Sequence, residues 1–189
     1  VDKVAMERTA MTLATLFGYP QEDRRQLTRW SDILTTAEPG PGKIVETMES
    51  KFAALENPGW TCWSIGNHDV PRVATRWGKG QGGAQFSKLM MALQACLRGS
   101  VCLYQGDELG LTEADIPFEL LQDPYGITFW PEFKGRDGCR TPMPWQAGAA
   151  NAGFTPGQPW LPIPAEHALA AIDTQEKPRE SVLNFSRRF

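Results

Sequence analysis

The chain has 189 residues, 41% of them hydrophobic, and its 19 basic and 22 acidic residues give a net charge of −3. Neither sign of charge forms a long run, which argues against nucleic acid and anionic membranes as partners. No apolar run approaches the roughly 20 residues that a membrane-spanning helix needs. The chain could bury a core, but it begins with Val1 and stops at Phe189 inside a predicted helix. We therefore expect it to be a piece of a longer protein.

The four cysteines, Cys62, Cys96, Cys102 and Cys139, are scattered along the chain without a CxxC pair. Zinc ligands usually come in closely spaced pairs, so this pattern favours buried free thiols over a metal site or a disulfide framework. Free thiols are typical of a reducing, cytoplasmic setting. We expect no metal and no cofactor.

The N-terminal part, residues 1–41, carries few clear signals. Apolar residues at helical spacing predict a helix over 4–17, but the best strand candidate, 30–34, is interrupted by two polar residues. A Pro-Gly turn at 38–42 then precedes a helix predicted over 43–55. The register of this first segment stays open.

Two apolar runs predict strands at 61–65 and 101–104. Between them, residues 84–98 have an apolar stripe at helical spacing that includes Leu89. Strands separated by one helix in this way are parallel neighbours joined by a helical crossover. The glycines at 78–83 could instead form a phosphate cradle, but they lack the GxxxxGK[ST] pattern and no strand directly precedes them.

A polar triplet, Asn67-His68-Asp69, directly follows the first of these strands. A carboxylate and an imidazole at a strand end sit on fixed backbone and face open space, as catalytic groups do at the C-terminal rim of an α/β barrel. The alternative is that Asn67 and Asp69 only form a turn or cap the next helix.

Two further blocks follow the triplet. The triplet extends to Asn-His-Asp-Val-Pro-Arg at 67–72, the second strand breaks into Tyr-Gln-Gly-Asp-Glu-Leu-Gly-Leu at 104–111, and Arg-Asp-Gly-Cys-Arg-Thr-Pro-Met-Pro-Trp occupies 136–145. In this order the three blocks resemble the α-amylase superfamily of glycoside hydrolases, family 13, and within it the bacterial exo-acting α-glucosidases.

The resemblance covers residues 42–189 and implies an α/β fold: a partial (β/α)8 TIM barrel with about strands 7 and 8, their helices and the long loop after strand 8. A whole barrel of this kind takes about 250 residues. The loop-rich stretch 110–164, which has little periodicity, corresponds to that long loop. Residues 42–189 are thus expected to form the C-terminal part of the catalytic domain.

The resemblance also implies roles for the triplet. Retaining members use a nucleophilic Asp after strand 4 and an acid Glu after strand 5, while a third carboxylate grips the sugar hydroxyls near the anomeric carbon. Asp69 matches that third, transition-state-stabilising position, and His68 matches the imidazole beside it. The strands of the other two carboxylates are not recognisable in this chain. The chain alone is therefore expected to be inactive.

Arginines complete the expected sugar site. The resemblance makes Arg136 the first choice and Arg140 the second for holding the terminal glucose, and Asn67 and Arg72 are also expected to bind substrate. A rigid guanidinium fork suits a carboxylate or vicinal hydroxyls better than a lysine does. The alternative is a structural salt bridge that ties the loop to the barrel.

Several other residues have weaker signals. Asp107 and Glu108 are expected to organise their loop, and His167 is expected on the surface of a helix. Three aromatic residues could either line the sugar pocket or serve as packing: Trp130, Phe133 and Trp145.

The sequence thus indicates a retaining α-glucosidase that releases terminal glucose from oligosaccharide or disaccharide substrates, such as maltose-type sugars or sucrose. One alternative is a transglycosylating relative of the sucrose isomerase type, against which Pro144 favours hydrolysis. The other is a non-catalytic barrel module, against which the intact Asn-His-Asp triplet counts.

Overall fold

The computed structural model describes residues 50, 62–78 and 83–188. The chain divides into two compact units, 1–58 and 59–189, and all described residues except Ser50 belong to the second. The helix predicted at 4–17, the strand candidate at 30–34 and, apart from Ser50, the helix predicted at 43–55 lie outside the described residues. The boundary between 41 and 42 stays a prediction.

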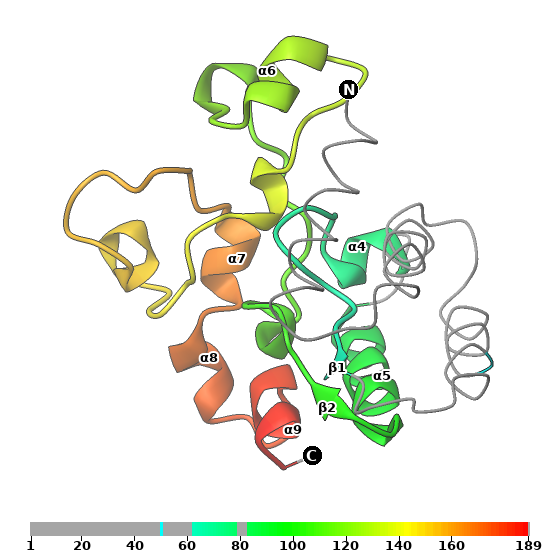
Figure 1. Cartoon of the computed structure of the whole chain (residues 1–189). Helices are drawn as coiled ribbons and strands as arrows, with labels where there is room; N and C mark the ends of the chain where they lie inside the picture. The colour runs from blue at the N-terminus through cyan, green and yellow to red at the C-terminus, as the bar shows by residue number, and fades with distance from the viewer. Residues whose placement is uncertain (1–49, 51–61, 79–82, 189) are drawn as a thin grey trace. The chain divides into compact units, whose positions relative to one another are not determined.

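The described part of the second unit contains short strands, α-helices and 3₁₀ helices (Figure 1). In chain order they are β1 (Cys62–Trp63), α4 (Val73–Arg76), α5 (Gly83–Cys96), β2 (Ser100–Val101), η2 (Asp107–Leu109), η3 (Phe118–Leu120), α6 (Pro124–Phe129), η4 (Asp137–Cys139), η5 (Ala150–Gly153), α7 (Ala165–Leu169), α8 (Ile172–Glu176) and α9 (Val182–Arg188).

Strands β1 and β2 pair in parallel, with Cys62 opposite Ser100 and Trp63 opposite Val101. Helices α4 and α5 lie between them in the chain, so the predicted parallel pair with a helical crossover is confirmed. Both strands are shorter than predicted. The buried amide of Gln94 explains part of this, because its Nε2 donates to the Cys102 carbonyl at 3.1 Å, where a longer ladder would otherwise bond. The same Nε2 donates at 2.6 Å to the Trp63 carbonyl, which also accepts the Cys102 amide of the ladder.

Helix α5 confirms the prediction over 84–98, but the predicted buried face is only partly right. Met90 and Met91 are buried as core residues, while Leu89 is 62% exposed. The side that packs against α9 and η2 also carries polar residues. Buried Lys88 is satisfied there because its Nζ donates to the carbonyl of Glu180 in front of α9. Helical spacing therefore located the helix but not all of its packed face.

Two apolar clusters hold the long loop in place. Leu109, Leu111 and Leu183 form one, so that α9 packs against the segment after β2. The second consists of Ala114, Ile116, Leu121 and Leu161, with Trp130 packed against it. The stretch 110–164 contains only short helices. The order of this stretch therefore comes from tertiary packing.

Two predictions about burial are wrong. Cys62, Cys96 and Cys102 are exposed, and of the four cysteines only Cys139 is buried. His167 is 1% exposed rather than a surface residue. Its Nε2 donates to the Thr112 carbonyl at 2.9 Å and its Nδ1 lies 3.3 Å from the Thr141 hydroxyl.

None of the helices among the described residues is both long enough and apolar enough to cross a membrane.

Candidate active site

The loop after β1 is built by short-range polar contacts. The amide of Asp69 donates to Oδ1 of Asn67 at 2.8 Å, which forms a local turn. Arg76, on α4, donates from Nη2 to the carbonyl of Ile65 at 2.5 Å and so fixes the start of the loop. Asn67 therefore has the turn role that the sequence left open. Its predicted contact with substrate stays a prediction.

Asp69 lies between two arginines that are far away in sequence. Its Oδ1 accepts hydrogen bonds from Nη1 of Arg136 and Nη2 of Arg140, both at 3.0 Å, across 67 and 71 residues. Oδ2 lies 3.3 Å from Nε2 of His68. Arg140 also donates from Nε to the carbonyl of His68 at 2.8 Å. Four predicted site residues thus meet in one group.

This group faces solvent in the described structure, since the side chains of His68 and Asp69 are 67% and 47% exposed. Those of Arg136 and Arg140 are 27% and 28% exposed. Both arginines engage the same carboxylate oxygen, so Oδ2 and the imidazole form the more open edge. Hydrogen-bonding groups that are fixed but exposed are suited to binding the hydroxyls of a ligand.

Arg136 is held in place by Asp123, a residue that the sequence did not indicate as part of the site. Its Nε and Nη2 donate to the two carboxyl oxygens of Asp123 at 2.8 and 2.9 Å, and its backbone N–H donates to Oδ2 at 2.8 Å. The Asp123 side chain is 0% exposed. The hydrogen bonds from Arg136 lower the pKa of Asp123 to about 2. Such a bidentate pair fixes the plane of the guanidinium group.

A sequence signal for Asp123 existed, but it indicated a different role. The residue precedes Pro124 at the start of α6, and its Oδ1 accepts from the Tyr125 amide at 3.2 Å, as an N-cap does. The ring of Tyr125 also lies 5.1 Å from the guanidinium carbon of Arg136. Nothing in the local pattern indicates that the same carboxylate pairs with Arg136.

The turn that carries the two arginines is tied to the segment after β2. The hydroxyl of Tyr104 donates to the carbonyl of Cys139 in η4 at 3.0 Å. The Cys139 thiol, which is fully buried, donates to the carbonyl of Arg136 at 3.1 Å. These contacts hold both ends of η4, so that Arg136 and Arg140 point toward Asp69 together.

Arg72 lies apart from the Asp69 group, although it is one of the predicted substrate-binding residues. It is 1% exposed, and its Nη1 donates to the carbonyl of Gln105 at 2.7 Å. Its guanidinium carbon is 5.5 Å from the centre of the Tyr104 ring, and its amide donates to Glu113 Oε2 at 2.8 Å. In this arrangement Arg72 links the loops that follow the two strands. A contact between Arg72 and substrate stays a prediction.

Asp107 is a buried carboxyl beneath the same loops. It is 6% exposed, and neither of its oxygens has a hydrogen-bond partner among the described residues. Burial raises its pKa to about 6, against the opposing effect of Arg72. A Cβ on Gly66 would lie 3.0 Å from Oδ2, so the loop before the triplet passes directly over Asp107. Its neighbour Glu108 accepts the Gly106 amide at 2.7 Å, a contact that organises the loop.

Residues 17–189 match the family described as "Alpha amylase, catalytic domain". The chain belongs to this family. A probable alpha-glucosidase of Rhizobium meliloti (strain 1021) is 47% identical over 150 residues, which are 79% of this chain and 27% of that protein. The probable oligo-1,6-glucosidase 2 of Bacillus subtilis (strain 168) is 33% identical over 153 residues, 71% of this chain and 27% of that protein.

Solved structures agree with this assignment. The alpha-glucosyl transfer enzyme XgtA is 51% identical with a TM-score of 0.73, over 84% of this chain and 29% of that one. A mutant of isomaltulose synthase from Erwinia rhapontici NX5, in complex with its natural substrate sucrose, is 26% identical with a TM-score of 0.68, over 80% of this chain and 30% of that one.

The chain therefore spans less than a third of the length of these relatives. Its fold is a fragment of a (β/α)8 barrel, as the sequence predicted. The assignment of β1 and β2 as strands 7 and 8 stays a prediction.

Proposed function

We propose that this chain contributes one part of the active site of a retaining α-glucosidase, which releases terminal glucose from maltose-type oligosaccharides or sucrose. The observation that carries the proposal is the Asp69 carboxylate, whose Oδ1 is held at 3.0 Å by both Arg136 and Arg140. The relatives named as glucosidases support the same activity.

In this mechanism Asp69 stabilises the transition state. Positive charge develops at the anomeric carbon as the glycosidic bond breaks, and hydrogen bonds to the sugar hydroxyls become stronger at that point. The two arginines hold Oδ1 of the carboxylate in place, so little reorganisation is needed when the charge appears. His68, 3.3 Å from Oδ2, would donate to the same sugar. We assign neither the nucleophile nor the acid/base carboxyl to a residue of this chain.

The proposal is tested with the full-length gene product that carries this chain. The protein is mixed with maltose or with sucrose to test for glucose release. The anomer of the first glucose released from sucrose, whose leaving group is fructose, is followed by NMR before mutarotation, because the reducing-end glucose of maltose leaves as both anomers. We expect α-glucose to appear first, because two displacements retain the configuration. Initial β-glucose would contradict retention, and an absence of glucose release from either sugar would contradict the proposal as a whole.

A second candidate function is transfer of the glucosyl group to an acceptor hydroxyl other than water. The 51% identity to an alpha-glucosyl transfer enzyme favours it. Pro144 in the 136–145 block is the sequence feature that favours hydrolysis. The same NMR experiment with sucrose and added glycerol separates the two, because transfer yields glucosylglycerol and fructose whereas hydrolysis yields free glucose and fructose.

A further inference from the structure

Trp160 is an exposed aromatic residue with an unusual anchor. Trp160 is 56% exposed, but its indole N–H donates to the carbonyl of Arg140 at 3.1 Å. The rings of Phe154 and Trp160 are nearly perpendicular, with their centres 5.0 Å apart and their planes at 89°. Arg140 in turn bonds Asp69 and His68. One residue therefore connects the indole to the proposed sugar-binding group.

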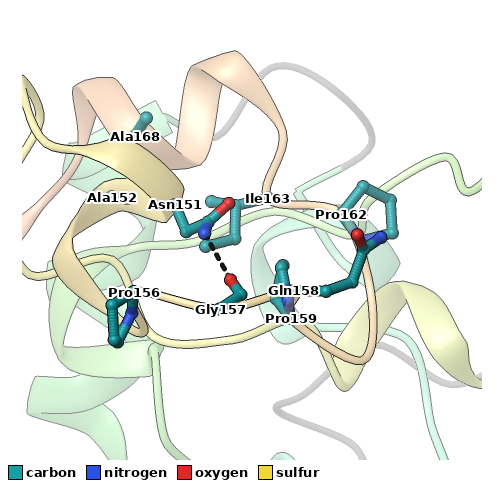
Figure 2. A pocket seen from close by; sticks show the side chains of 9 residues that line it. All are labelled: Asn151, Ala152, Pro156, Gly157, Gln158, Pro159, Pro162, Ile163 and Ala168. Atoms are coloured by element: carbon teal, nitrogen blue, oxygen red, sulfur yellow. Dashed lines mark hydrogen bonds between the residues drawn. The ribbon is translucent and has the colours of Figure 1, made fainter.

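The loop that presents Trp160 is held in shape by Asn151. Its side-chain amide donates to the carbonyls of Thr155, at 3.1 Å, and Gly157, at 2.7 Å, and Figure 2 shows the second of these bonds. Asn151 has a φ of 49°, a left-handed conformation that asparagine adopts more readily than most residues.

The same loop borders a cavity of about 620 Å³, whose lining includes Gln158 and Pro159 just before Trp160 (Figure 2). Prolines at 156, 159 and 162 restrict the backbone around the tryptophan. A ring that is fixed before binding loses little conformational entropy when a ligand covers it. The loop is therefore built to present an aromatic face.

We propose that Trp160 is a stacking platform for the second sugar of the substrate, the ring on the leaving-group side of the scissile bond. The proposal rests on the function proposed above. The occupant is inferred from position, because the indole N–H bonds the backbone carbonyl of Arg140, whose guanidinium group bonds Asp69. The next ring of a disaccharide is the covalent neighbour of a glucose bound at Asp69. Sugar C–H groups carry slight positive charge and pack on the negative face of an aromatic ring.

Two substrates separate stacking from a structural role. Maltose has a second sugar ring, whereas α-glucosyl fluoride has only a fluoride ion as its leaving group, and both need the Asp69 group. In the full-length gene product, we expect Trp160→Ala to lower kcat/KM for maltose about tenfold, the size of a good aromatic contact, and to leave α-glucosyl fluoride nearly unchanged. Trp160→Phe keeps a ring but loses the anchor, so the loss for maltose should be smaller.

Phe118→Ala serves as the matched control. Phe118 is 43% exposed and its ring contacts Trp130, 5.6 Å away between centres, rather than the Asp69 group. Its substitution should leave the ratio of the two kcat/KM values unchanged.

Each other outcome is decisive. An equal loss with both substrates in Trp160→Ala would overturn the inference and make Trp160 a structural residue, and no loss with either would also overturn it. A wild-type protein that cleaves neither substrate would overturn the proposed function itself, and this inference with it.

Discussion

Removal of the Arg136 guanidinium should destabilise the protein substantially. Arg136→Met keeps most of the apolar stem but leaves the Asp123 carboxylate, which is 0% exposed, without its charged partner. Removing one member of a buried pair typically costs about 3 to 5 kcal/mol. Here two backbone amides still bond Asp123, from Arg136 at 2.8 Å and Tyr125 at 3.2 Å. We therefore expect a smaller loss, roughly 2 to 3 kcal/mol.

The pKa of Asp123, which is lowered chiefly by the same Arg136 contacts, agrees with this magnitude. It falls from 3.8 to about 2 on folding, which corresponds to roughly 2 kcal/mol. Because the folded pKa is depressed, this stabilisation is fully present above the unfolded pKa near 4 and is lost as the pH falls toward 2. The destabilisation caused by Arg136→Met should therefore shrink between about pH 4 and pH 2.

Urea denaturation of the full-length gene product at pH 7 and at pH 3 measures both effects. Arg136→Lys keeps the charge but cannot form the bidentate contact with Asp123, so it should recover only part of the lost stability. Arg179→Met is the control, because the Arg179 side chain is 87% exposed and its nearest acidic oxygen is 3.9 Å away; it should change stability by less than about 0.5 kcal/mol. An Arg136→Met variant as stable as this control at pH 7 would refute the anchoring role of Asp123.

Three further predictions concern buried charge, the shape of the site and the isolated chain. Burial raises the pKa of Asp107 to about 6, so the folded state binds this proton more tightly and the free energy of unfolding should fall from about pH 4 to pH 6. In urea denaturation, Asp107→Asn should show a shallower decline over this range and higher stability than wild type at pH 7. An unchanged pH profile would contradict this. If Arg136 closes the end of the site, the full-length gene product should release glucose from starch with little loss of viscosity, whereas a rapid loss would indicate an endo-acting enzyme. The 189-residue chain alone should fold poorly, because the described sheet has unpaired edges and Leu89 is exposed, and it should lack glycosidase activity. A soluble monomer with a sharp melting transition that releases p-nitrophenol from an α-glucoside would refute this.

The regular elements could be predicted where the sequence has a clear period. The apolar runs before Asn67 and Gln105 gave the parallel strands, and helical spacing gave α5. Strand lengths were overestimated, in part because the Gln94 side chain takes up the Cys102 carbonyl that a longer ladder would have used. Side-chain competition of this kind leaves no period in the sequence.

The candidate site was predictable through motifs but its supports were not. The triplet and the 136–145 block pointed to Asp69, His68 and the two arginines, and the structure brings these residues together. Asp123 was missed because it lies in an aperiodic loop, where pairing depends on the tertiary path of the chain. The wrong prediction for His167 has the same origin, since its five-residue helix is covered by distant loop segments.

The central claim is that the arginine-held Asp69 stabilises the transition state, and turnover of Asp69→Asn in the full-length gene product tests it most directly. The substitution keeps the shape of the side chain but removes its charge, so the melting temperature should stay close to that of wild type. We expect kcat for maltose to fall at least about a hundredfold, and His68→Ala to cost less because the imidazole supplies only a hydrogen bond. Near-normal kcat in a folded Asp69→Asn variant would contradict the claim.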